Sequence, residues 1–149
     1  MISSTPVRVR YKDTDCMSVV YYGNYLTYFE VGRVEFLRQQ GYTIAEINRS
    51  VYMPVVEALV RYVRPARLDD LLDVRCWVSE RKRASFRFAY EIRNEVGEVV
   101  ATGSTLHACW DAGTNRMVGV PDWLQAIMPV APPGAGGPAA PGTGGRANC

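Results

Sequence analysis

Apolar and polar residues alternate along several segments of the chain, and the alternation is clearest over Ser85–Arg93. Every second residue of that segment is aromatic or aliphatic, which is the period of a strand with one buried face. Similar patterns predict strands at residues 6–11, 53–63 (broken near its start by Pro54), 72–80 and 99–110, and a short edge strand at 117–120. Turns are predicted at residues 94–98 and 111–116.

The spacing becomes helical between residues 24 and 40. Tyr25, Phe29 and Phe36 fall on one face of such a helix, and Gly41 stands where a glycine commonly ends one. Two shorter helical turns are predicted, at residues 44–48 and 123–128. The segment 24–40 is therefore the only long helix that the pattern predicts.

Hairpin-length connections between successive strands favour an antiparallel sheet, and the long helix precedes most of the strands. The pattern thus predicts an α+β domain with one long helix and about five strands. Residues 1–128 are enough for one domain with a substantial core. Residues 129–149 contain five Pro and six Gly and almost no large apolar side chain, so we expect them to form a disordered tail.

Charge changes this picture only locally. The net charge of +2 is too small to argue for nucleic-acid binding. Basic residues nevertheless crowd the middle of the chain: Arg61, Arg64, Arg67, Arg75, Arg81, Lys82, Arg83, Arg87 and Arg93. They form either a patch for a small anionic ligand or the solvated faces of strands.

The four cysteines, at positions 16, 76, 109 and 149, have neither metal-ligand nor redox-motif spacing. The chain starts in a polar, extended segment without the apolar core of a signal peptide. We therefore expect reduced thiols in a cytoplasmic protein. No apolar run approaches the ~20 residues that a membrane helix needs.

The candidate catalytic residues lie just before the long helix, where Asp15 precedes a turn that leads to the helix start. The first N–H groups of a helix have no intrahelical partner, and they lie at the positive end of its dipole. A carboxylate beside such donors suits attack on a carbonyl, because the donors stabilise the oxyanion while the carboxylate acts as nucleophile or base.

Two other groups near Asp15 offer rival chemistry. Asp13 and Asp15 form a D-x-D pair, but a hard-metal site normally needs further oxygen ligands, so we expect no metal and a solvated Asp13. Cys16 with His107 as base would make a thiol nucleophile, but nothing near His107 in the sequence suggests an orienting partner. His107 is expected to be a hydrogen-bonded histidine of the sheet.

Two blocks of the sequence resemble the hotdog-fold acyl-CoA thioesterases, in particular the 4-hydroxybenzoyl-CoA thioesterase-like group. The first is similar to D-x-x-G-x-V-Y-x-x-x-Y and is matched by Asp15, Val20, Tyr21 and Tyr25. The second is similar to Y-x-x-P-A-x-x-x-D and covers residues 62–70. The resemblance extends over residues 7–123. It implies the hotdog fold, in which one long helix is packed across a curved antiparallel sheet.

The resemblance also implies roles for individual residues. Asp15 matches the catalytic carboxylate, and the backbone N–H of Tyr22 matches the donor that polarises the thioester carbonyl. Glu30 matches an acidic residue that faces the acyl pocket in aromatic-specific relatives, although an ion pair with Arg33 or Arg38 on the helix surface is an equal alternative. Lys82 and Arg83 match basic residues that contact the phosphates of CoA.

The chain departs from the family pattern at two positions of the first block. Many relatives carry His where this chain has Tyr22, and since the donor is a backbone group, the exchange leaves the chemistry possible. Ser18 stands where the family usually has Gly, which bears on how tightly the loop turns.

The function implied is hydrolysis of an acyl-CoA thioester to a carboxylic acid and CoA, with no cofactor and no metal. An acyl-carrier-protein thioester is an alternative substrate, because both carriers present the same phosphopantetheine arm. A non-catalytic acyl-CoA-binding module is the alternative from another class. The resemblance further implies a homodimer or homotetramer with active sites at the subunit interface. The acyl group is not specified.

Overall fold

The computed structural model describes residues 1–135 of the 149-residue chain. In chain order its elements are β1 (Ser3–Arg8), the 3-10 turn η1 (Tyr11–Asp13), α1 (Asn24–Gln39), α2 (Ile44–Ile47), β2 (Val51–Tyr52), β3 (Val55–Tyr62), β4 (Leu71–Arg81), β5 (Ser85–Arg93), β6 (Val99–Asp111), β7 (Met117–Val118) and α3 (Asp122–Ala126). Five strands have six residues or more, and β2 and β7 have two residues each.

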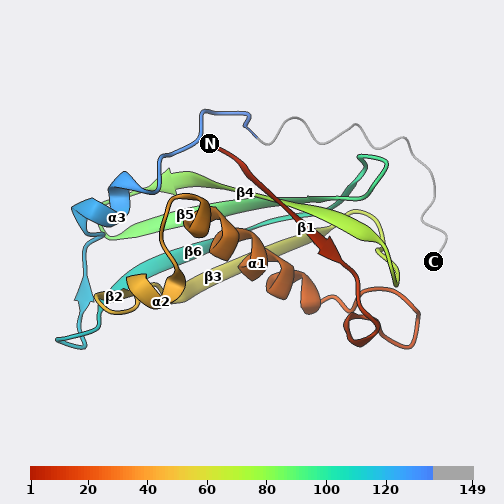
Figure 1. Cartoon of the computed structure of the whole chain (residues 1–149), viewed down its shortest axis with the longest axis horizontal. Coiled ribbons are helices and arrows are strands. Elements are labelled where there is room, and N and C mark those ends of the chain that lie inside the picture. The colour runs from red at the N-terminus through yellow and green to blue at the C-terminus, as the bar shows by residue number, and fades with distance from the viewer. Residues whose placement is uncertain (136–149) are drawn as a thin grey trace.

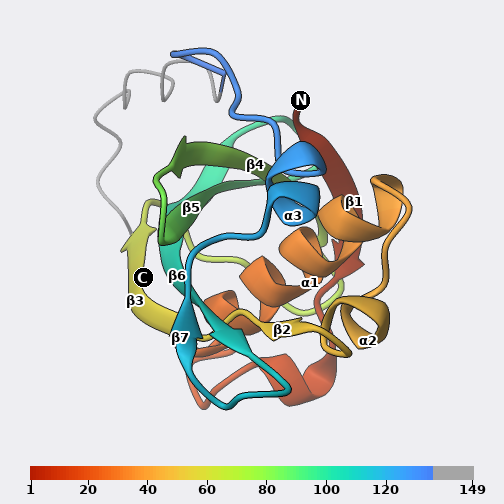
Figure 2. The same ribbon diagram turned by 90° about the vertical axis from the view of Figure 1, so that its left-hand side faces the viewer.

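All strands belong to one antiparallel sheet. β1, β4, β5 and β6 are neighbours in that order, and β6 pairs with β3 along most of its length and with β2 and β7 near its end. The two long free edges are therefore β1 and β3. The sheet curves around α1, which lies across its concave face (Figures 1 and 2). This is the hotdog arrangement, as the sequence predicted.

Close packing of α1 on the sheet depends on two glycines. The Phe29 ring is fully buried and stacks on Tyr90 at 4.3 Å between ring centroids. A Cβ on Gly103 of β6 would lie 2.2 Å from the Leu59 carbonyl oxygen and 2.5 Å from the Phe29 ring. A Cβ on Gly32 of α1 would meet Val74 of β4 at 2.9 Å. Small residues at these positions let helix and sheet approach each other.

Most predicted elements are confirmed within a few residues. The helix predicted at 24–40 is α1, and Ser85–Arg93 is β5. The first strand was placed too late: it covers Ser3–Arg8, and Tyr11 belongs to a 3-10 turn. The Asp13 carboxylate accepts a hydrogen bond from the Arg10 N–H at 2.9 Å, which closes this turn and ends the extended segment.

The domain also extends beyond the predicted boundary at residue 128. The Ala131 N–H donates to the Val78 carbonyl at 2.9 Å, and Val130 forms a parallel bridge with Val78. Ala131 is 7% exposed, so residues 129–131 pack on β4 and do not belong to a disordered tail. The rest of the predicted tail, from residue 136, lies outside the described residues. Within residues 1–135, no helix is long and apolar enough to cross a membrane.

Candidate active site at the start of the long helix

Asp15 begins a tight loop that leads into α1. The Asp15 N–H donates to the Val19 carbonyl at 2.9 Å, and the Ser18 N–H donates back to the Asp15 carbonyl at 3.0 Å. Ser18 has a φ of 62°, in the region that favours glycine. The loop therefore keeps the conformation that Gly would allow, and Ser18 adopts it at some cost in strain.

The Asp15 side chain is half-buried, and one of its two carboxylate oxygens has no hydrogen-bond partner among the described residues. Oδ1 accepts a hydrogen bond from the Met17 N–H at 2.8 Å. Among the described residues, no donor bonds to Oδ2 and no cation lies within ion-pair distance. One oxygen thus holds the side chain in place while the other remains available for chemistry.

Tyr22 follows at the other end of the same loop, directly before the helix. Its carbonyl accepts the Tyr62 hydroxyl at 2.8 Å, which joins the helix start to the end of β3. Within residues 1–135, no group accepts a hydrogen bond from the Tyr22 N–H, whereas its neighbour Tyr21 donates to the Asp13 carbonyl at 2.9 Å. The Tyr22 N–H is thus available for a substrate oxygen.

A small recess of about 240 Å³ opens beside Tyr22, lined mainly by Tyr25, Tyr62 and the backbone that follows β3. The rings of Tyr25 and Tyr62 meet edge to face at 5.2 Å between centroids. Hydrogen bonding to Tyr22, burial and the Asp15 charge all raise the pKa of Tyr21 above its usual value. Asp15 and the tyrosines at the helix start therefore form one cluster.

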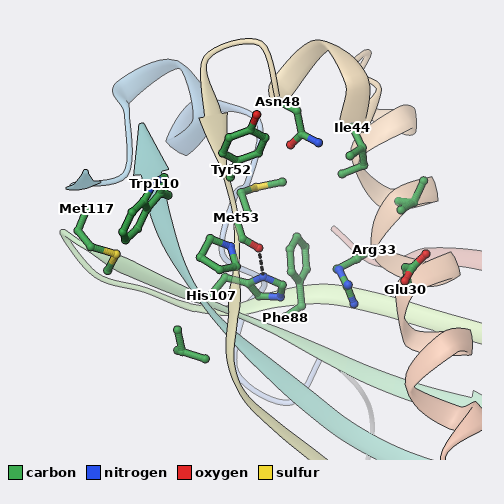
Figure 3. A pocket seen from close by; sticks show the side chains of 13 residues that line it. Glu30, Arg33, Ile44, Asn48, Tyr52, Met53, Phe88, His107, Trp110 and Met117 are labelled. Carbon is green, nitrogen blue, oxygen red and sulfur yellow. Dashed lines mark hydrogen bonds between the residues drawn. The ribbon is translucent and has the colours of Figure 1, made fainter. Parts of the chain in front are cut away.

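A larger cavity of about 740 Å³ lies further along α1, toward α2, β2 and the end of β6 (Figure 3). Its wall is mostly apolar, with Ile44, Met53, Phe88 and Trp110 among the lining residues. Glu30 and Arg33 contribute charge from α1. Asp15 does not line this cavity.

Glu30 and Arg33 do not form the predicted surface ion pair. Within residues 1–135, neither has an oppositely charged partner within 4 Å, and Arg38 pairs with Glu35. Arg33 extends toward Phe88 in Figure 3. Burial raises the pKa of the Tyr90 phenol, and the positive charge of Arg33 partly opposes this rise. Glu30 thus stands exposed at a cavity rim.

The floor of this cavity is supported by a buried chain of polar side chains. The Tyr90 hydroxyl lies 2.6 Å from Thr105 Oγ1, which lies 2.8 Å from His107 Nε2, and His107 Nδ1 lies 3.1 Å from the Met53 carbonyl. Because a carbonyl only accepts, Nδ1 carries the proton and Nε2 accepts from Thr105. Burial lowers the pKa of His107 to about 4, so the ring stays neutral near pH 7. The expectation of a hydrogen-bonded sheet histidine is confirmed.

Lys82 and Arg83 lie far from Asp15 within one chain. They occupy the hairpin between β4 and β5, while the other end of β4 pairs with β1 beside the Asp15 loop (Figure 1). The eleven residues of β4 span about 35 Å. Lys82 is exposed and lies 3.1 Å from Glu80, and Arg83 has no side-chain partner among the described residues.

Most of the other central arginines are engaged in the sheet. Arg87 pairs with Glu57 and Glu80, and Arg93 pairs with Glu91. Arg81 donates to two carbonyls around α3. For these residues the structure supports the interpretation as structural side chains of the sheet. Arg61, Arg67 and Arg83 have no acidic side-chain partner among the described residues and remain candidates for an anionic ligand.

Asp13 was wrongly predicted to be a solvated loop residue. Its carboxylate accepts the Tyr28 hydroxyl at 2.9 Å, and Tyr28 is 3% exposed. Within residues 1–135, no group of three or more His, Cys, Asp or Glu side chains could hold a metal ion. Cys16 is exposed and lies in the Asp15 loop, whereas His107 is buried beneath the large cavity, so the two do not form a nucleophile–base pair.

Comparisons with known proteins identify the family of this chain. An acyl-CoA thioesterase, YbgC, from Haemophilus influenzae is 37% identical over 128 residues, which cover 84% of this chain and 93% of that protein. A 1,4-dihydroxy-2-naphthoyl-CoA hydrolase from Thermosynechococcus vestitus is 30% identical over 138 residues and covers 88% and 94%. The crystal structure of DHNA-CoA thioesterase from Staphylococcus aureus superposes with a TM-score of 0.78 at 34% identity, covering 84% and 87%. Residues 9–128 match the sequence profile of the thioesterase-like superfamily, and the chain belongs to that family.

Proposed function

We propose that this protein is an acyl-CoA thioesterase that hydrolyses a thioester to a carboxylic acid and CoA. The observation that carries the proposal is that Asp15 Oδ2 and the Tyr22 N–H, which lie in one tight loop before a helix, both lack a hydrogen-bond partner among the described residues. The relatives named as acyl-CoA thioesterases support the choice of substrate class.

The reaction follows from these two groups. The thioester carbonyl oxygen accepts from the Tyr22 N–H, where the positive end of the α1 dipole stabilises the charge that develops on it. Asp15 either attacks the carbonyl carbon, forming an acyl anhydride that water then cleaves, or removes a proton from the attacking water. In both routes the C–S bond breaks and CoA leaves as its thiol after protonation.

The active unit is proposed to be a homodimer joined along β3. This strand pairs with β6 on one side only, and its apolar side chains stay exposed, with Val56 at 57% and Leu59 at 47%. A free edge of eight residues with this composition is a template for pairing with another strand. Antiparallel pairing of two copies of β3 forms a closed two-fold dimer.

Such a dimer would bring the separated parts of the site together. A two-fold axis at β3 reverses the partner, so its Asp15 loop lies toward the end of this chain that carries the large cavity and the Lys82–Arg83 hairpin tip. We propose that Asp15 and Tyr22 of one subunit act on a thioester whose acyl group fills the cavity of the other. Glu30 then faces the acyl group, and the hairpin tip faces the CoA phosphates.

The proposal is tested by measuring thiol release from a panel of aromatic, short-chain and medium-chain acyl-CoA thioesters. We expect turnover with the wild type and a loss of several decades in kcat for Asp15→Asn, each decade being about 1.4 kcal/mol of barrier. Thermal unfolding of the variant should match the wild type. More than a tenth of wild-type turnover in Asp15→Asn would contradict the role of Asp15.

The same panel separates the alternatives. Acyl-carrier-protein thioesters cleaved faster than every CoA thioester would favour the carrier protein as substrate. Tight binding of acyl-CoA without any turnover would favour a binding module. Glu30→Gln should change the ranking of hydroxylated against plain acyl groups, because an acyl hydroxyl that enters the cavity without its acceptor is costly to bury.

A further inference from the structure

We infer that Asp13 is a positioning residue for the reaction, and that Tyr28 holds it in place. Asp13 sets where the Asp15 carboxylate lies relative to the Tyr22 N–H. This inference rests on the proposed function and deepens it, since it concerns the geometry of the same site.

Asp13 accepts four hydrogen bonds, two at its carboxylate and two at its carbonyl oxygen. Its carboxylate Oδ2 accepts from the Tyr28 hydroxyl and from the Arg10 N–H, each at 2.9 Å. Its carbonyl oxygen accepts from the Tyr21 N–H at 2.9 Å and from the Asn24 side-chain amide at 2.8 Å. One residue thereby joins the end of the first strand segment, the residue before Tyr22, and the first and second turns of α1.

The position of Asp13 in the chain makes these bonds matter for the site. It stands two residues before Asp15, and Tyr21, which it holds, directly precedes Tyr22. Both reacting groups are therefore fixed to the same anchor, one through Thr14 and one through Tyr21. Loss of the anchor would let the two ends of the loop shift relative to each other.

Tyr28 connects this anchor to the rigid part of the fold. It lies on the buried face of α1 and is 3% exposed. Burial, together with the hydrogen bond and charge of Asp13, raises the pKa of Tyr28 well above its usual value, so the hydroxyl keeps its proton and donates. A hydrogen bond to an ionised acceptor in such a place is stronger than one between neutral groups.

The two carboxylates of the D-x-D pair differ in the hydrogen bonds that they accept. Asp13 Oδ2 is held by two donors, whereas Asp15 Oδ2 has no partner among the described residues. Asp13 is thus committed to structure around the site, and Asp15 is available to the substrate. A displacement of about 1 Å between catalytic groups can lower turnover by about 100-fold.

The experiment compares kcat and KM of Tyr28→Phe, Asp13→Asn and their double variant on the best acyl-CoA of the panel. Tyr28→Phe keeps the buried ring and removes only the hydroxyl. We expect kcat to fall at least tenfold in each single variant while KM stays within about twofold, since the lost alignment affects the transition state. The double variant should be no slower than the slower single variant, because both substitutions break the same hydrogen bond between Tyr28 and Asp13.

Leu124→Val is the matched control for stability, since Leu124 is fully buried in α3, far from the loop. It should lower the unfolding temperature as the Tyr28 variant does and leave kcat unchanged. Wild-type kcat in both Tyr28→Phe and Asp13→Asn, with Asp15→Asn inactive, would overturn this inference alone. An Asp13→Asn variant as inactive as Asp15→Asn, beside a fully active Tyr28→Phe, would also overturn it, since Asp13 would then act directly. An active Asp15→Asn would instead reject the proposed function.

Discussion

Asp13 and Asp15 are the same residue type two positions apart, but their hydrogen bonds differ. The carboxylate of Asp13 is held by two donors, whereas that of Asp15 keeps one oxygen without a donor among the described residues. The motif around Asp15 could be recognised in the sequence because its parts follow one another closely in the chain, from Asp15 to Tyr25. The partner of Asp13 is Tyr28, fifteen positions later in the chain. Tyr28 lies on the buried face of the helix, and the sequence pattern gives it no role besides packing. Contacts of this kind depend on how the loop folds back on the helix, so residue spacing does not reveal them.

His107 supplies a prediction about pH at the same scale. Its folded-state pKa is about 4, below the unfolded value of about 6.5. Between these values the unfolded chain binds a proton that the folded chain does not, so stability falls as the pH falls, by up to about 1.4 kcal/mol per pH unit. The chain has a single histidine, which makes the slope between pH 6.5 and 5 a measurement of this residue.

Denaturant unfolding at pH 7, 6 and 5 measures the slope. His107→Gln should flatten it, because the amide stays neutral throughout. An equal slope in the wild type and the variant would show that His107 is not held in its neutral form.

At the scale of elements, the sequence predicted those helices and strands that the local pattern of apolar and polar residues determines. The helix α1 and the strand β5 follow from periodicity, and the strand predicted at residues 53–63 starts only after Pro54, at Val55. The short strand β2 was not predicted. The first strand and the C-terminal boundary were wrong because long-range contacts decide them. The Asp13 bond to Arg10 ends the extended segment, and β4 holds Ala131.

The contact between α1 and the sheet gives a prediction for two glycines. Gly103→Ala places a methyl group 2.2 Å from a backbone oxygen, which cannot move without disturbing β3. Gly32→Ala meets a Val74 methyl group at 2.9 Å, and alanine also favours the helix by about 1 kcal/mol. We expect Gly103→Ala to lower stability by about 3 kcal/mol or more and Gly32→Ala by clearly less.

Denaturant titration of the two variants measures both changes. Gly32→Ala serves as the matched control, since it adds the same methyl group elsewhere in the contact between α1 and the sheet, where it meets only side-chain atoms. Equal losses of stability in the two variants would mean that β3 can move away from β6 to make room for the methyl group of Gly103→Ala.

At the scale of the whole molecule, the separation of Asp15 from the large cavity is the main feature that the sequence could not provide. Residues Asp15, Glu30, Lys82 and Arg83 were each chosen from local motifs, and nothing in the sequence places them in space. The fold keeps Asp15 and Tyr22 in one loop before α1, and of the four chosen residues only Glu30 lines the large cavity. The homo-oligomer and the cytoplasmic location stay predictions.

A substitution on the free edge of β3 tests the proposed dimer. Leu59→Lys puts a charge on the exposed edge and should shift the protein toward monomer, with activity falling in parallel. Light scattering coupled to size-exclusion chromatography measures the change. Val96→Lys is the matched control, because Val96 is 77% exposed in the turn between β5 and β6. A Leu59→Lys variant that stays dimeric would move the interface to another surface.

The central claim is that Asp15 of one subunit acts on an acyl group held in the cavity of the other, and subunit mixing tests it most directly. Asp15→Asn removes the carboxylate, and Glu30→Trp fills the cavity rim; each homodimer should be inactive. A mixed dimer, co-expressed with two tags and purified through both, should contain one intact site and recover about half of wild-type activity. An inactive mixed dimer that folds and binds as the wild type does would contradict the shared site.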